Sequence, residues 1–143
     1  MSPIELGIGW GEMEKEARGK PLPDGTYEFI VDHVDEQETA AGRPRWIWFL
    51  KVVNHPQYNG RTVRYGTPLP WTDSSGQKDT SGIAFLYRMV NGCGKQIMGT
   101  QLPDKEFFYG AGGFMKVKGV PDRNDPDTIY NEAQIVQPKK AMK

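Results

Sequence analysis

The stretch from Arg43 to Val53, Arg-Pro-Arg-Trp-Ile-Trp-Phe-Leu-Lys-Val-Val, constrains the fold of this chain more than any other. Its aromatic and β-branched residues, without helical spacing of the apolar positions, are typical of a β-strand. Because successive side chains of a strand point to opposite faces, one face is wholly apolar and the other carries a cation at each end. The apolar face holds Trp46, Trp48, Leu50 and Val52, and the mixed face holds Arg45, Ile47, Phe49 and Lys51.

The mixed face of this strand has two interpretations. A single nucleic-acid strand stacks its bases on aromatic rings and places its phosphates against Lys or Arg, and a ring between two cations offers both contacts. Alternatively, the strand is buried on both faces, and Arg45 and Lys51 only reach water at its ends. A β-bulge that reverses the strand parity would instead expose Trp46 and Trp48 as the stacking rings.

The composition is that of a single domain with many turns. A chain of 143 residues with 37% hydrophobic residues can bury a core, and 17 glycines and 11 prolines supply the turns of an all-β chain. The lone Cys93 excludes an internal disulfide and is typical of a reducing cytoplasm. No apolar run approaches the ~20 residues of a membrane span, so no membrane partner is expected. The 18 basic and 18 acidic residues balance, so a positive surface must be local.

Five strands and one helix are expected. The strands are placed at about residues 26–35, 43–53, 61–66, 114–120 and 129–137. The helix is expected near Thr80 to Asn91, and its apolar side would hold Ile83, Leu86, Tyr87 and Val90. Three strands, a helix and two strands is the order of a five-stranded OB-type Greek-key barrel. The sequence therefore predicts an all-β fold with one helix between the third and fourth strands, although other small β-barrels with an inserted helix stay open.

The chain is expected to divide into three parts. Pro21-Leu-Pro-Asp-Gly25 is a strong turn, and residues 1–22 are expected to form a flexible N-terminal arm. Residues 23–138 would form the barrel domain, and residues 139–143 a basic C-terminal tail.

Four short motifs mark the starts of expected strands or lie within them. They are Pro23-Asp-Gly-Thr-Tyr27, Trp46, Gly60-Arg61-Thr-Val63 and Tyr130-Asn131. Together they resemble bacteriophage-encoded single-stranded DNA-binding proteins of the OB-fold type, over about residues 22–138. The resemblance implies a non-catalytic protein that coats single-stranded DNA in phage replication or recombination. It also implies phage or host replication and recombination proteins as partners, and the host cytoplasm as the location.

Two features depart from that family pattern. Such proteins often end in an acidic tail that recruits partners, whereas this chain ends in Pro138-Lys-Lys-Ala-Met-Lys143. Its formal net charge is +0. For this chain, the resemblance therefore implies neither recruitment of partners through the C-terminus nor high affinity for single-stranded DNA.

The outward faces of the expected strands give a candidate surface for single-stranded DNA. The fourth strand repeats the pairing of an aromatic ring with lysines, while the acidic residues fall mostly on the first strand and the arm. The predicted nucleic-acid-binding residues are Arg45, Phe49, Lys51, Arg64, Trp71, Phe114, Lys116 and Lys118. Trp71, in a proline-bracketed loop, is equally consistent with a lid over the barrel end, and lysines on exposed strands also protect sheet edges. Trp48 and Tyr65 are assigned to the core.

Catalytic and metal-binding constellations are weak. His33 and His55 with one cysteine cannot complete a Cys/His zinc site, and Gly92-Cys-Gly-Lys95 lacks the spacing of a phosphate loop. No enzyme activity, metal or cofactor is expected. The alternative to DNA binding is a β-barrel protein-interaction or virion structural module without nucleic-acid binding. A small hydrolase has the least support, since no nucleophile-base pair is found. The sequence does not indicate an oligomeric state.

Overall fold

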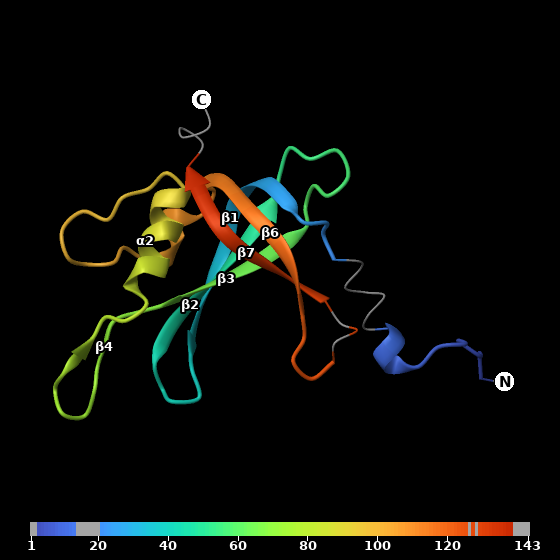
Figure 1. The fold of residues 1–143 in the computed structure, drawn as a ribbon, viewed down its shortest axis with the longest axis horizontal. Helices are drawn as coiled ribbons and strands as arrows, with labels where there is room; N and C mark the ends of the chain where they lie inside the picture. Colours follow the sequence, from blue (N-terminus) through green and yellow to red (C-terminus); the bar gives the residue numbers. More distant parts are fainter. Residues whose placement is uncertain (1–2, 14–20, 126, 128, 139–143) are drawn as a thin grey trace.

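The computed structural model describes residues 3–13, 21–125, 127 and 129–138. Five strands form one antiparallel sheet in the order β3-β2-β1-β6-β7 (Figure 1). They are β1 (Gly25–Glu38), β2 (Pro44–Val52), β3 (Thr62–Pro68), β6 (Gly112–Pro121) and β7 (Ile129–Pro138). Between β3 and β6 the chain forms β4 (Trp71–Thr72), β5 (Lys78–Asp79), the helix α2 (Ile83–Gly92) and the 3-10 helix η1 (Lys105–Phe108). The predicted all-β fold, with a helix between the third and fourth main strands, is confirmed.

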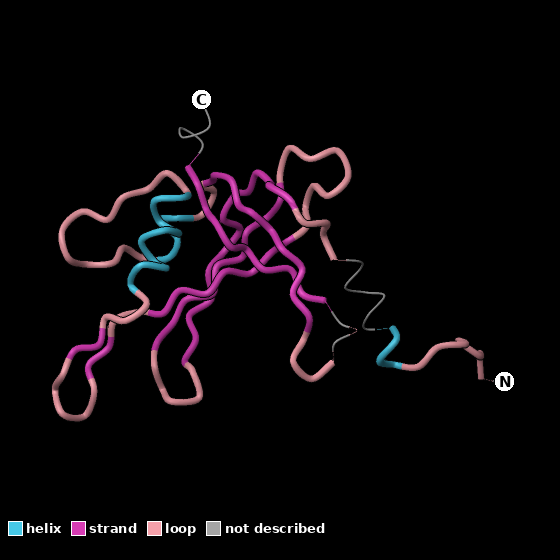
Figure 2. The backbone as a smooth tube through the Cα atoms, viewed as in Figure 1, coloured by secondary structure: helices cyan, strands magenta, loops and turns pink. Residues whose placement is uncertain are grey.

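The long strand β1 joins the two halves of the sheet. Its first half, Gly25–Ile30, pairs with β6, and its second half, Phe29–Glu38, pairs with β2. A register shift between Val31 and His33 marks a bulge, which bends a strand and increases its twist. The sheet therefore coils on itself (Figure 2). In the described part of the chain β3 and β7 are not hydrogen-bonded to each other, and no sheet closes into a barrel.

The core lies on the apolar face of β2. Trp46, Trp48, Leu50 and Val52 are all buried, so the predicted parity of this strand is confirmed and the reversed register is wrong. The indole of Trp48 lies 5.1 Å, centroid to centroid, from the ring of Phe108. Burying each such side chain contributes about 1.5–3 kcal/mol to folding, so this layer holds β2 against β1, β3 and η1.

The helix α2 differs from its prediction at its start and in its buried side. It begins at Ile83 after Gly82, which has a φ of 85° and provides no side-chain cap, rather than at Thr80. Leu86, Met89 and Val90 are buried, whereas Ile83 is 45% and Tyr87 69% exposed. The predicted apolar side, which includes Ile83 and Tyr87, and the observed buried side, which includes Met89, both have helical spacing. Only packing against the sheet decides which side is buried.

Two further segments were not predicted in their observed form. The loop that carries Trp71 is a short β4–β5 hairpin, whose turn is closed by Asp73 Oδ1 accepting from the backbone N–H of Ser75 and of Gln77. In β7 Ala133 is buried as expected, but Ile129, placed inward by alternation, is 38% exposed at the end of the sheet.

The domain starts at Leu22, the last residue of the predicted arm. Leu22 is buried, its N–H donates to Asn131 Oδ1 at 2.8 Å, and its carbonyl accepts from Asn131 Nδ2 at 3.0 Å. Tyr27 Oη donates to the Pro23 carbonyl at 2.6 Å, and Asp24 Oδ1 accepts from the Gly119 N–H at 2.9 Å. Two of the motifs that carried the resemblance thus fix the start of β1 to β6 and β7.

The described N-terminal residues contribute little to this domain. Residues 3–12 are exposed and residues 10–13 form a helical turn, while the predicted tail, 139–143, lies outside the described residues. No helix in the described ranges is long and apolar enough to cross a membrane.

Candidate nucleic-acid interface

The outward face of β2 and β3 forms a continuous track. The antiparallel register places Lys51 opposite Thr62, Phe49 opposite Arg64, Ile47 opposite Gly66, and Arg45 opposite Pro68. All four β2 residues are half-buried, and their β3 partners are exposed or, at Gly66, lack a side chain. At about 3.3 Å per residue, the eight steps from Lys51 to Arg43 span roughly 26 Å. We call this surface the β2–β3 track.

The ring of Phe49 is flanked from both neighbouring strands. His33 of β1 stacks on it, with ring centroids 4.2 Å apart and planes inclined by 12°. The Arg64 guanidinium of β3 lies 5.3 Å from the ring centroid. His33 Nδ1 in turn contacts Asp32 Oδ2 at 2.7 Å. Phe49 is therefore the centre of a row of planar groups across three strands rather than a bare ring.

An apolar gap follows Phe49 along the track. Gly66 carries no side chain, and a Cβ built there would contact Ile47 Cδ1 at 3.5 Å. Ile47 is left half-exposed between Phe49 and Arg45. Arg45 Nη2 donates to Gln37 Oε1 at 3.2 Å, whereas its Nε is buried without a partner among the residues that the structure describes. This stretch places the apolar side chain of Ile47 beside the Arg45 guanidinium.

The β4–β5 hairpin extends the track beyond Arg45. The Arg43 guanidinium lies 5.0 Å from the centroid of the Trp71 ring and 3.3 Å from Asp79 Oδ2. Trp71 Nε1 donates to the same carboxylate at 3.4 Å. Hydrogen bonds from Ser81 lower the pKa of Asp79, so Asp79 is ionised at neutral pH and holds both groups. Trp71 is half-buried in a strand, not in an irregular loop.

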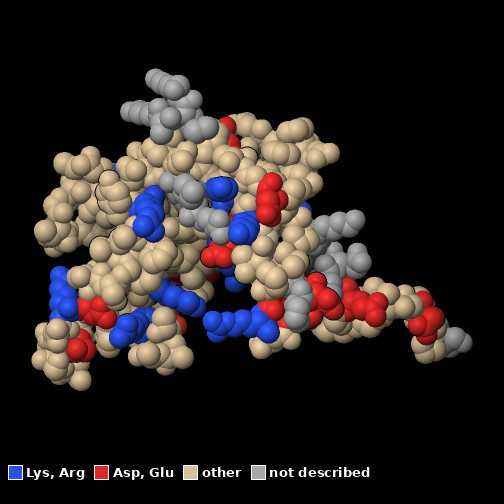
Figure 3. All heavy atoms as spheres, in the orientation of Figure 1, with Lys and Arg blue, Asp and Glu red and all other residues tan. Residues whose placement is uncertain are grey.

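The remaining predicted residues form a separate group on β6. Phe114 is half-buried, Lys116 and Lys118 are exposed, and Phe114 lies opposite Glu28 of β1. Since the first half of β1 lies between β2 and β6, Glu28 stands between the two groups. Asp32 and Asp35 are exposed, and Glu28 Oε2 accepts from Asn54 Nδ2 at 2.7 Å. In the view of Figure 3, Lys and Arg form several clusters with Asp and Glu between them.

The structure thus divides the predicted residues into two sets. Arg45, Phe49, Lys51, Arg64 and Trp71 share the β2–β3 track, and Phe114, Lys116 and Lys118 form the β6 group. The prediction placed the acidic residues on β1 correctly, but it did not foresee that β1 runs between the two sets.

Three residues of the track were missed. Arg43 continues the alternation 43, 45, 47, 49 and 51, so the period of the strand could have indicated it. Gly66 alternates with Thr62 and Arg64 in the same way. His33 could not be found by alternation, because the bulge after Val31 shifts its parity.

Cys93 is the single cysteine of the chain, and its side chain is buried. Burial raises the pKa of Cys93 to about 11, and its Sγ donates to the Val90 carbonyl at 3.3 Å. A protonated thiol engaged in this way is a poor nucleophile. Within the described ranges, no three His, Cys, Asp or Glu side chains gather as a metal site would require.

Comparison with curated proteins gives no match. Residues 12–140 match the model of a family described as "Protein of unknown function (DUF669)". Because this match covers most of the 143 residues, the chain belongs to the DUF669 family.

Proposed function

We propose that this protein binds single-stranded DNA along the β2–β3 track, without catalysis. The observation that carries the proposal is the order of groups along the track: Lys51, Phe49 with Arg64, Ile47 with Gly66, Arg45, and Trp71 with Arg43. Aromatic and apolar surfaces alternate with cations, as the bases and phosphates of a single strand require.

The strand order supports an OB-type fold for this function. The order β3-β2-β1-β6-β7, with a helix between β3 and β6, is consistent with an OB-type Greek key left open between β3 and β7. OB-folds bind oligonucleotides on the face of their second and third strands. Taken with the resemblance to phage single-stranded DNA-binding proteins, this favours DNA coating in phage replication or recombination inside the host cell, together with replication or recombination proteins.

Binding would rearrange the row of planar groups at Phe49. A cation–π contact at an exposed site is worth about 0.5–1 kcal/mol, whereas a base stacked on an aromatic ring is worth about 1–3 kcal/mol. A base can therefore displace Arg64 from Phe49, and the released guanidinium would then contact a phosphate. His33 would stay beneath the ring and keep it in place.

Titration of a fluorescent single-stranded oligonucleotide, followed by anisotropy, tests the proposal. Phe49→Ala should weaken binding by about 1–3 kcal/mol, the usual worth of a stacking ring, and Lys51→Ala should weaken it by removing a phosphate contact. Arg88→Ala is the matched control, because it deletes the same charge from α2, away from the track. Thermal melts check that each variant is folded.

Two outcomes would refute this function. One is wild-type protein that does not bind the oligonucleotide or binds duplex equally well. The other is a set of track variants that bind like Arg88→Ala. Failure of the wild-type protein to bind the oligonucleotide would favour the second candidate, a protein-interaction or virion module, which is supported by the exposed apolar residues of the N-terminal segment.

A further inference from the structure

The N-terminal segment carries four large apolar side chains in water. Ile4, Leu6, Ile8 and Trp10 are 87%, 63%, 43% and 73% exposed. They alternate with Glu5, Gly7 and Gly9 along the sequence, and Trp10 begins the helical turn 10–13. Figure 1 shows the segment projecting away from the sheet. Clustered apolar exposure of this kind marks an interaction site.

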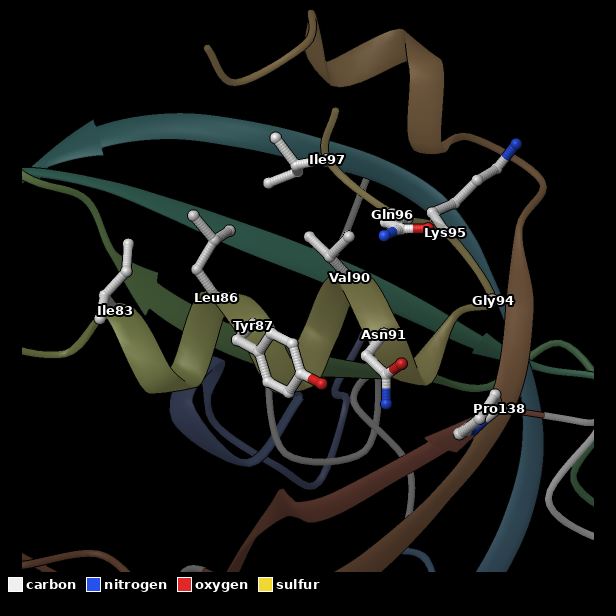
Figure 4. A pocket seen from close by; sticks show the side chains of 10 residues that line it. All are labelled: Ile83, Leu86, Tyr87, Val90, Asn91, Gly94, Lys95, Gln96, Ile97 and Pro138. Carbon is white, nitrogen blue, oxygen red and sulfur yellow. The ribbon is translucent and has the colours of Figure 1, made fainter. Parts of the chain in front are cut away.

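A groove for such side chains lies beside α2. It has a volume of about 650 Å³ and runs between α2, the segment after the helix, and the end of β7. Its apolar wall is formed by Ile83, Leu86, Tyr87, Val90 and Ile97. Figure 4 shows Leu86 and Val90 pointing toward Ile97, with Tyr87 and Asn91 on the side of Pro138. The groove thus extends from the buried side of α2, at Leu86 and Val90, to its exposed side, at Ile83 and Tyr87.

We propose that the N-terminal segment of one copy of this chain binds in the α2 groove of a second copy. Apolar side chains would fill the groove, and the charges are complementary. The charged residues described in the segment, Glu5 and Glu12, are acidic, whereas Lys95 lines the groove. In the sequence Pro138 is followed by Lys139 and Lys140.

The placement of segment and groove favours a second copy over the same chain. In Figure 1 the N-terminal segment and α2 lie at opposite ends of the molecule, and the segment points away from the helix. The contact joins two different surfaces, so it is heterologous and can build a head-to-tail pair or a longer chain. It uses no residue of the β2–β3 track and is independent of DNA binding.

Sedimentation of the full-length chain over about a hundredfold range of concentration tests the contact, because assembly is concentration-dependent. The wild-type mass should rise above that of one chain as concentration increases. Leu6→Asp with Trp10→Asp, and separately Ile83→Asp with Tyr87→Asp, should each stay at one chain. Phe85→Asp is the control: it adds one such charge to α2 at a side chain that is 46% exposed and outside the groove, and it should assemble like wild type.

Mixing the two deficient proteins gives the decisive result. The segment variant keeps an intact groove, and the groove variant keeps an intact segment, so together they should form one-to-one pairs and nothing larger. Circular dichroism verifies that each variant is folded. The proposal is overturned by a wild-type chain that stays monomeric throughout, by variants that assemble like wild type, by loss of assembly in Phe85→Asp, or by a mixture that forms no pairs.

Discussion

At the scale of single residues, the hydrogen bond between Trp48 and Thr67 links β2 to β3 inside the core. Trp48 Nε1 donates to Thr67 Oγ1 at 2.9 Å, and neither side chain reaches solvent. Thr67→Val keeps the shape but leaves the indole N–H unpaired, which should lower the free energy of unfolding by about 1–3 kcal/mol. Thr62→Val, at an exposed position of the same strand, is the control and should change it little. Chemical denaturation measures both, and equal effects would contradict the role of the bond.

Cys93 gives a second prediction at this scale. Because its pKa is raised to about 11, the thiol is protonated at pH 8 and buried, and only the thiolate reacts with alkylating agents. We expect iodoacetamide to label the native protein very slowly at pH 8 and the denatured protein quickly. Mass spectrometry of timed samples measures both rates. Fast labelling of the native protein would show that the end of α2 opens readily.

At the scale of elements, β6 packs against the end of α2 backbone to backbone. A Cβ at Gly113 would collide with the carbonyl oxygens of both Gly92 and Gln137, so only glycine fits between the helix and β7. Gly113→Ala should destabilise the fold by at least about 1–3 kcal/mol, the usual cost of overpacking. Gly25→Ala is the control in a strand, since its Cβ would meet only an ordinary contact at 3.9 Å. Thermal melts of the two variants test this close approach, and a Gly113→Ala melt that matches Gly25→Ala would contradict it.

The same elements show how far the sequence can predict this fold. Alternation correctly placed Trp46 and Trp48 inside and Phe49 outside, because a strand with one apolar face has one stable register. Alternation failed at His33, where the bulge inserts a residue. It could not choose the buried side of α2, because the stripe with Met89 and the stripe with Tyr87 are both apolar. Pairings between distant strands, which set β1 between β2 and β6, leave no local pattern at all.

At the scale of the whole molecule, basic side chains lie on the strands at either side of β1, and acidic side chains lie on β1 itself. The cations of β2 and β3 face outward on one side of β1, and Lys116 and Lys118 lie on the other. On β1, Asp35 lies opposite Ile47 of the track, and Glu28 lies opposite Phe114 of β6. A polyanion that follows the β2–β3 track runs beside Asp35, whereas one that crosses from β2 to β6 must pass over β1 at Glu28. The arrangement therefore favours a strand laid along β2 over one laid across the sheet.

The salt dependence of binding tests this path. Each phosphate contact with single-stranded DNA contributes about −0.7 to the slope of log K against log salt. Three to four contacts from Arg43, Arg45, Lys51 and Arg64 should therefore give a slope of about −2 to −3. Lys51→Ala should make the slope less steep by about 0.7, because one contact is lost. Lys116→Ala removes the same charge from β6 and should leave the slope unchanged. Oligonucleotide titrations at several salt concentrations measure all three slopes. A Lys116→Ala slope that matches Lys51→Ala would mean that the bound strand crosses β1, and binding without salt dependence would exclude phosphate contacts on either path.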